Sequence, residues 1–272
     1  MNYHSDEWIM NRIKEHYKEA NQYFDENRII GIFNQGSANY GLDYETSDVD
    51  TKLIVVPSFK DIALNRKPVS TTHIRENEEH IDFKDIRLYI ETFRKQNVNF
   101  VEILFTPYSC VNDIYSEEWR RLVEARERIA RMNPWRAVKA MKGVALEKYH
   151  AMEHEYPSKM EILAKYGYDG KQLHHLVRID YFLTQYIAGA DYGTAMIPTG
   201  SMRDFLMSIK TNEWDLTAAR NLAEVSLNHI EELSTWFCNK TEDKEDPEMR
   251  DLLEDVSYNI MKIAVKNELE NN

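Results

Sequence analysis

The spacing of apolar residues changes along the chain and indicates helices in some segments and strands in others. Behind Ser5, a typical N-cap residue, apolar side chains recur three or four positions apart, which predicts a helix that packs on a sheet. Short apolar runs follow and predict strands, with a short helix over 59–64 between them. The expected strands are 28–33, 48–56, 69–75 and 80–84, of which the last two form a hairpin or two neighbouring strands.

Residues 100–105 fit either a final strand or the end of a helix, and a further helix is expected over 116–132. From residue 133 onward, the chain has helical periodicity and no strand signal. Asn133-Pro134 then marks a domain boundary, because asparagine caps helices and proline is favoured at the first helical position. Later helices are expected over 134–154, 158–166, 170–188, 199–209, 212–240 and 246–270.

With 272 residues, the chain is long enough to form two domains. The expected fold class is α+β. Residues 1–132 are predicted to form a mixed β-sheet domain flanked by helices, and residues 133–272 a C-terminal helical bundle.

Two aspartates stand one residue apart at the start of the second strand. Successive side chains of a strand point to opposite faces, so Asp48 and Asp50 should lie side by side while Val49 turns into the core. Adjacent carboxylates repel each other unless a cation neutralises them, and Mg²⁺ prefers one or two carboxylates together with substrate phosphates. The Gly36-Ser37 turn upstream can bring backbone N–H groups close to such phosphates. The stretch therefore predicts a metal–triphosphate site.

The spacing of these residues is similar to a known signature. Gly36-Ser37, ten intervening residues and Asp48-Val49-Asp50 resemble the polymerase-β-type nucleotidyltransferase superfamily. The pattern Gly-Ser-x-x-Tyr-Gly-Leu followed by Ser-Asp-x-Asp is most similar to its RNA-repair-associated polymerase-β-like members. The superfamily commonly has an apolar residue before the glycine, where this chain has Gln35. The resemblance covers about the first two thirds of the chain, since 97–107, 167–171, His175 and Arg178 also fit it.

The resemblance implies transfer of a nucleotidyl group from a nucleoside triphosphate to an acceptor hydroxyl, with release of pyrophosphate. Two Mg²⁺ or Mn²⁺ ions would assist, both bridged by Asp48 and Asp50. A third acid from a later strand would complete the acceptor side of the site. Asp82 is the favoured third acid, whereas Asp85 is a better candidate for the N-cap of the next helix.

Nucleotide contacts are expected from the turn and from the helical half of the chain. The resemblance implies that Gly36 and Ser37 hold the β- and γ-phosphates. Lys171, His175 and Arg178 recur at i, i+4 and i+7, which places them on one helix face. Three cationic groups in a row favour a bound anion, such as a triphosphate or an RNA phosphate. The alternative is that Arg178 pairs with an internal acid and Lys171 is merely solvated.

The net charge of −12 argues against a general nucleic-acid coat protein. The stretch 120–148 is an exception, with nine Lys or Arg and three Asp or Glu residues. Two interpretations of this stretch stay open. It receives a triphosphate or an RNA end, or it is a solvated helix surface paired with acidic neighbours.

Segments for export or membrane insertion are not expected. The sequence has no apolar run of about 18 residues and no cationic and apolar signal pattern at its start. Cys110 and Cys238 stand far apart without Cys-x-x-Cys spacing, which predicts reduced thiols rather than a disulfide or a zinc site. These features indicate a cytoplasmic protein without a membrane partner.

Two functions of different classes fit the sequence. The first is a metal-dependent nucleotidyltransferase whose acceptor is an RNA end, including tRNA, a small molecule or a protein side chain; RNA modification is one such use. The second is a non-catalytic module on the same fold that senses nucleotides or binds a partner. Because Asp48, Asp50 and a candidate third acid are all present, we expect catalysis.

Overall fold

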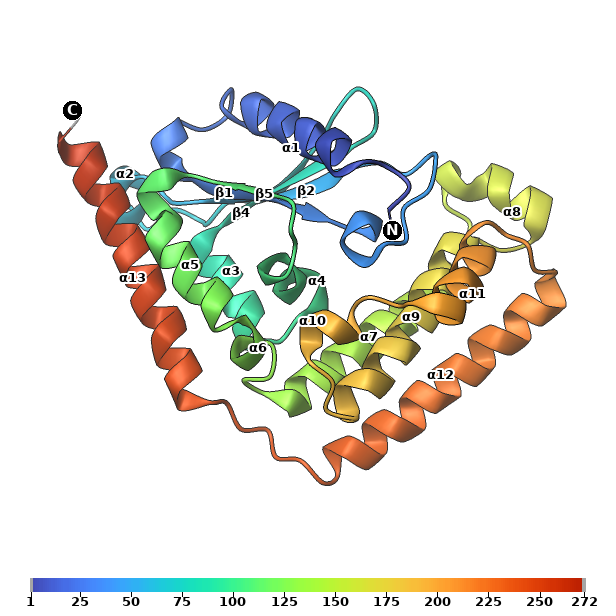
Figure 1. Ribbon diagram of the computed structural model, residues 1–272. Coiled ribbons are helices and arrows are strands. Elements are labelled where there is room, and N and C mark those ends of the chain that lie inside the picture. The colour runs from blue at the N-terminus through green and yellow to red at the C-terminus, as the bar shows by residue number, and fades with distance from the viewer. Residues whose placement is uncertain (1, 271–272) are drawn as a thin grey trace. The chain divides into compact units, whose positions relative to one another are not determined.

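The computed structural model describes residues 2–270, which divide into two compact units (Figure 1). Unit 1 contains the chain up to Met132 and the segment from Glu245 onward, and unit 2 contains Asn133–Lys244. Unit 1 holds the sheet, and unit 2 is helical. The mixed α+β composition expected from the sequence is confirmed.

A mixed five-stranded sheet forms the centre of unit 1, in the order β3-β4-β2-β1-β5. Strands β2 and β4 are parallel, and the other neighbours are antiparallel. The expected hairpin of β3 and β4 is present, whereas β5 is too short to give a periodic signal and was not predicted. The strands are β1 Ile29–Gln35, β2 Asp50–Val55, β3 Ser70–Ile74, β4 His80–Asp85 and β5 Ser109–Val111.

Helix α1, Asp6–Ala20, covers one face of the sheet, and α3, Ile86–Arg94, and α4, Val98–Val101, lie on the other (Figure 1). The Ser5 side chain accepts a hydrogen bond from the Trp8 backbone N–H and begins α1, as predicted. The apolar stripe of α1 packs in a core with residues of β2 and β4 that point to the same side: Ile9, Ile13, Leu53, Val55, Ile81 and Phe83.

In the remaining part of unit 1, the structure decides between the two alternatives for one segment and corrects one expected helix. Residues 100–105 form the end of α4 and a short 3₁₀ turn rather than a strand. The helix expected over 116–132 is interrupted at Ala125, where the backbone leaves helical geometry. The other helical elements are α2 Phe59–Ala63, α5 Ser116–Glu124, α6 Arg126–Ile129 and α13 Pro247–Glu270, with 3₁₀ turns η1 Glu26–Arg28, η2 Ser37–Tyr40, η3 Glu102–Leu104 and η4 Asp113–Tyr115.

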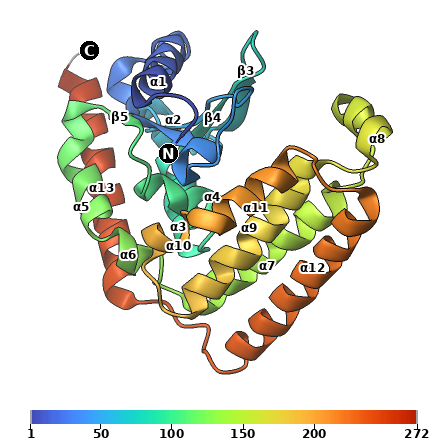
Figure 2. The same ribbon diagram turned by 45° about the vertical axis from the view of Figure 1, so that its right-hand side comes forward.

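The expected helical domain of residues 133–272 is shorter than predicted, because α13 belongs to unit 1. Its apolar stripe packs against α3 and α5, and both views show α5 and α13 side by side (Figures 1 and 2). Ion pairs also join this segment to the rest of unit 1: Arg121 lies 2.7 Å from Asp255 of α13, and Arg94 lies 2.9 Å from Glu245, which precedes the helix. An amphipathic helix shows in its sequence that it has a partner but not which partner it has.

Unit 2 is a helical bundle that begins at the predicted Asn133-Pro134 break. The Asn133 side chain accepts a hydrogen bond from the Arg136 N–H, and Pro134 occupies the first turn. Helices α7, α9 and α12 pack against one another, and α11 packs on α9. The helices are α7 Pro134–Ala151, α8 Met160–Tyr166, α9 Gly170–Ile187, α10 Tyr192–Ala195, α11 Gly200–Lys210 and α12 Leu216–Cys238, with the 3₁₀ turn η5 Pro157–Lys159.

The segment 167–171 joins α8 to α9. Gly167 ends α8 with a φ of 79°, a left-handed conformation that glycine adopts most readily. Asp169 caps α9 by accepting from the Lys171 N–H. A Cβ atom at Gly170 would lie 2.5 Å from the Ile209 carbonyl oxygen, so only glycine permits this approach of α9 to the end of α11. Most of this segment therefore has a structural role.

Within residues 2–270, no helix is long and apolar enough to cross a membrane. Cys110 in unit 1 and Cys238 in unit 2 are both free thiols.

His174 makes the stability of unit 2 sensitive to acid. Its ring is buried on α9 and hydrogen-bonds to the Leu206 carbonyl, and burial lowers its pKa to about 3. The unfolded chain takes up this proton as the pH falls below about 6.5, whereas the folded chain does not, so protonation favours unfolding. Burial also lowers the pKa of neighbouring His175.

We expect His174→Gln, whose amide can still donate to Leu206, to lose less stability than the wild type on acidification. Between about pH 7 and about pH 4.5, this residue should account for about 3 kcal/mol of the unfolding free energy. Denaturant titrations at both pH values measure the difference, with the exposed His150→Gln as the control. Equal pH dependence in all three proteins would contradict the prediction.

Candidate functional site

The register of β1, β2 and β4 places a row of polar side chains on the sheet face that lies away from α1. Gln35 pairs with Asp50 across β1 and β2, and Lys52 pairs with Asp82 across β2 and β4. Asp50 and Lys52 are two residues apart on one strand, so they share a face. Val49 points the other way and is buried in the core under α1, as the sequence predicted.

Asp48 and Asp50 lie where β2 begins, and Asp48 itself precedes the strand. Asp48 is exposed, and within residues 2–270 its carboxylate takes part in no hydrogen bond or ion pair of the structure. The Asp50 carboxylate is held in place by His80, whose backbone N–H donates to it at 2.8 Å and whose Nδ1 lies 3.3 Å away. One acid is thus fixed, and its neighbour is open to a ligand.

Asp82 on β4 is surrounded by donors. Thr72 Oγ1 donates to one carboxylate oxygen at 2.6 Å, and the Gln35 side-chain amide approaches the other at 3.5 Å. The Lys52 Nζ lies 3.6 Å from that second oxygen. The Asp82 side chain is about a third exposed, so it can be reached from solvent on this face.

Lys52 was not recognised as a site residue from the sequence. Only 5% of its side chain is exposed; its ammonium also donates to the Gln35 side-chain oxygen and lies 4.6 Å from the centre of the Phe100 ring. Burial lowers the pKa of Lys52, and the nearby Asp82 carboxylate opposes this shift. Lys84, the next residue of this face on β4, stacks on the same ring at 4.0 Å. Strand alternation could have placed Lys52 beside Asp50, but a single lysine gives no signal of burial.

Asp85 is not part of this row. Its side chain accepts from the Arg87 N–H at 2.9 Å and so caps α3, and it is almost fully buried and paired with the Arg87 guanidinium. Helix capping therefore accounts for Asp85, and Asp82 is the acid of β4 that shares the face of Asp50.

The Gly36-Ser37 turn follows β1 directly. Gly36 has φ 99° and ψ −155°, a combination that is essentially restricted to glycine, and a Cβ atom there would point into open space. The turn is braced by Asn39, whose amide donates to the Asn34 carbonyl at 2.9 Å and whose side-chain oxygen accepts from Thr106 at 2.6 Å. Because Gln35 pairs with Asp50, the turn lies beside the start of β2.

Glu79 is a second residue that the sequence did not single out, because it lies between the expected strands 69–75 and 80–84. It is buried against α1, where it contacts the guanidinium of Arg12, the Arg75 Nη1 at 2.8 Å and the His16 Nε2 at 2.9 Å. Its other oxygen accepts from the Val49 N–H at 3.2 Å. The ion pairs and hydrogen bonds hold the pKa of Glu79 far below its usual range against the opposing effect of burial. Glu79 therefore holds the Asp48–Asp50 segment through the Val49 N–H, and its neighbour His80 holds it through the Asp50 carboxylate.

The donor set fits a divalent ion that is shared with phosphates. Asp48 and Asp50 supply carboxylate oxygens, which Mg²⁺ and Mn²⁺ accept, and Mg²⁺ commonly uses only one or two such protein ligands. Across residues 2–270, no three His, Cys, Asp or Glu side chains are grouped so that they could hold a metal ion by themselves. Asp82 already faces Lys52 and Thr72. The arrangement suits an ion that a triphosphate helps to bind rather than a closed cage of protein ligands.

The three predicted residues of α9 differ in exposure. Lys171 is exposed, His175 is partly exposed and Arg178 is buried. Burial, followed by the neighbouring His174 and Arg178, lowers the pKa of His175 well below its usual value. These residues lie in unit 2, whereas Gly36, Ser37 and the three acids lie in unit 1.

The basic stretch 120–148 is largely neutralised. Six of its nine cationic residues form ion pairs with acids of their own unit, and two others stack on aromatic rings. The interpretation as a paired helix surface is thus the one the structure supports. The six are Arg120, Arg121, Arg128, Arg136, Lys142 and Lys148.

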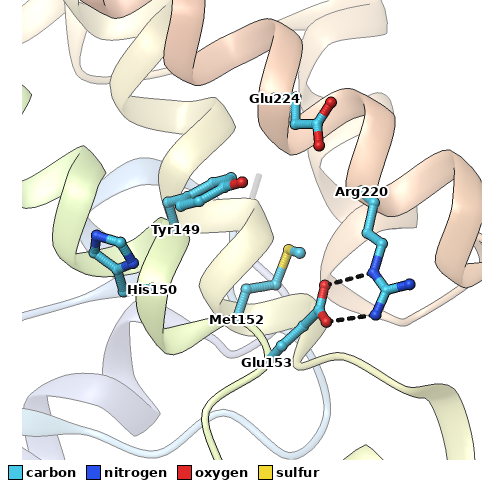
Figure 3. Close-up of a pocket in the computed structure, with 6 residues that line it drawn as sticks. All are labelled: Tyr149, His150, Met152, Glu153, Arg220 and Glu224. Atoms are coloured by element: carbon cyan, nitrogen blue, oxygen red, sulfur yellow. Dashed lines mark hydrogen bonds and ion pairs between the residues drawn. The ribbon is translucent and has the colours of Figure 1, made fainter.

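A separate cleft of about 290 Å³ lies within unit 2 (Figure 3). Its most basic group, Arg220, forms two hydrogen bonds to Glu153 at 2.9 and 2.7 Å. The guanidinium is neutralised by this pair, so the cleft gives no sign of an anion site. The lining residues are Tyr149, His150, Met152, Glu153, Arg220 and Glu224.

No protein-family profile and no curated protein matches this chain.

We expect Glu79→Gln to lower the free energy of unfolding by about 3 kcal/mol, since it leaves buried cationic groups without their counter-charge. Glu76→Gln, an exposed change in the same loop, should stay within about 0.5 kcal/mol of the wild type. Urea denaturation measures both. If the two variants were equally stable, the Glu79 cluster would not be what holds the Asp48–Asp50 segment.

Proposed function

We propose that this chain is a metal-dependent nucleotidyltransferase of the polymerase-β type. One observation carries the proposal: the sheet register sets Asp50 opposite Gln35, the residue before the Gly36-Ser37 turn, and puts Asp82 on the face of Asp50. A glycine turn and acidic side chains from two strands thus meet at one end of the sheet. This combination suits a nucleoside triphosphate bound together with a divalent ion.

Asp48 and Asp50 would hold Mg²⁺ or Mn²⁺, which when bound neutralises triphosphate charge and stabilises the leaving pyrophosphate. The backbone N–H groups and the hydroxyl of the Gly36-Ser37 turn would orient the β- and γ-phosphates. Asp82, accessible on the same face, would take up the proton of the acceptor hydroxyl. The acceptor oxygen forms a bond to the α-phosphorus while the bond from that phosphorus to the bridging oxygen breaks, and pyrophosphate leaves.

A separate proposal concerns Lys171, His175 and Arg178 of α9, which would bind a phosphate within unit 2. It is supported by their common helix face and by the exposure of Lys171. The acceptor we favour is a small molecule or a protein hydroxyl, because the basic stretch that could have received RNA is paired with acids.

The proposal is tested by incubating the protein with each α-labelled nucleoside triphosphate, Mg²⁺ or Mn²⁺, and either protein extract, small-molecule extract or total RNA. Metal-dependent transfer of label with release of pyrophosphate is the expected result. Saturable nucleotide binding without pyrophosphate release from any mixture would contradict catalysis and leave a nucleotide sensor as the better account.

We expect Asp48→Asn and Asp50→Asn each to lower label transfer by at least ~100-fold, since each removes a charge that the metal needs. Both variants should stay folded, because Asp48 is exposed and an asparagine in place of Asp50 still offers an oxygen to the His80 N–H. Glu45→Gln, an exposed change in the same loop, should transfer label at the wild-type rate. Wild-type turnover in either aspartate variant would exclude this metal assignment.

A further inference from the structure

The Lys52 ammonium, which faces Asp82, affects how many metal ions the proposed site can hold. Asp82 shares its second carboxylate oxygen with the Lys52 ammonium, 3.6 Å away, and with the Gln35 amide. Thr72 occupies the first oxygen at 2.6 Å. Each oxygen of this carboxylate therefore has a donor, and its charge is compensated without a metal.

Lys52 is held where it is. Its backbone lies opposite Asp82 in the parallel pair of β2 and β4, and its side chain is almost completely enclosed. The ammonium lies over the Phe100 ring and donates to Gln35, so three neighbours fix its position. Moving a buried ammonium away from its carboxylate would leave two charges without compensation.

A second divalent ion on Asp82 would have to bind next to this ammonium. The two positive charges would repel each other, because the Lys52 side chain is almost completely enclosed and little water screens its ammonium. Asp48 and Asp50 differ, since Asp48 is exposed at the start of β2 and is not engaged by any ion pair within residues 2–270. Asp48 and Asp50 are therefore better placed to bind a metal ion than Asp82 is.

We infer that Lys52 takes the place of the acceptor-side metal, so that the site binds one divalent ion at Asp48 and Asp50 and uses a fixed ammonium at Asp82. This inference rests on the proposed function. It makes Lys52 a positioning residue, which holds the Asp82 carboxylate in place on the face that the acceptor hydroxyl would approach. When the acceptor oxygen bonds to the α-phosphorus, its proton passes to Asp82, and pyrophosphate departs with the electrons of the broken bond.

The decisive measurement is the number of Mn²⁺ ions bound per chain in the presence of a non-hydrolysable nucleoside triphosphate analogue, counted by electron paramagnetic resonance. One Mn²⁺ per chain is the expected result. Two ions in the wild type would overturn the inference and leave the nucleotidyltransferase proposal standing. No bound Mn²⁺ would overturn both.

Lys52→Met extends the test, because it removes the ammonium and keeps an unbranched apolar side chain. This variant should bind a second Mn²⁺ and should transfer label on the order of 100-fold more slowly in Mg²⁺. Lys84→Met is the matched control, since Lys84 stacks on the same Phe100 ring but does not form the ion pair with Asp82; it should still bind one ion.

If the Lys52→Met protein folds, as judged by circular dichroism, and still binds a single Mn²⁺, the inference that Lys52 takes the place of the acceptor-side metal is contradicted. The wild-type count decides the inference even where this variant does not fold.

Discussion

Negative charge concentrated on one face of a sheet must be compensated, and this requirement shapes unit 1. Strand alternation and the parallel register of β2 and β4 bring Asp50 and Asp82 to the same face, where their charges add. The chain compensates one of them with a buried ammonium from Lys52 and fixes the other through His80. Asp48, beside them, is left exposed. Residues of the chain itself thus compensate part of the negative charge of the site, whereas the Asp48 carboxylate is left to solvent. Such a site is suited to a cation that binds together with its substrate.

The same principle explains the support behind the site. Glu79 is buried on the opposite face of the sheet, yet it is paired with Arg12, Arg75 and His16 and also accepts from the Val49 N–H. Because Val49 lies between the two aspartates, a network on the α1 side sets the position of carboxylates on the other side. Buried ionic networks of this kind are costly to break, which gives the loop before β2 a defined geometry.

The sequence allowed most of the elements, and the opposite facing of Val49 and Asp50, to be predicted because their signals are local. Caps such as Ser5, Asp85 and Asn133 act within three residues of their position, and the alternation of Asp48, Val49 and Asp50 follows from strand geometry alone. The Gly36 turn is equally local, since its backbone angles require glycine.

What could not be predicted depends on contacts between distant parts of the chain. Glu79 looked like a loop acid because its partners Arg12 and His16 lie more than sixty residues earlier in the sequence. The burial of Lys52 depends on Phe100 from α4, and the place of α13 in unit 1 depends on α3 and α5. Strand β5 has three residues, too few to show a period, and is defined by its pairing with β1.

The central claim is that a divalent ion and a triphosphate bind together at the start of β2. A crystal of the protein soaked with Mn²⁺ and a non-hydrolysable triphosphate analogue tests it most directly, through the anomalous scattering of manganese. The account predicts an anomalous peak in contact with Asp48 and Asp50, with the phosphates at the Gly36-Ser37 turn. A triphosphate bound elsewhere, or one bound at this turn without manganese at the two aspartates, would contradict it.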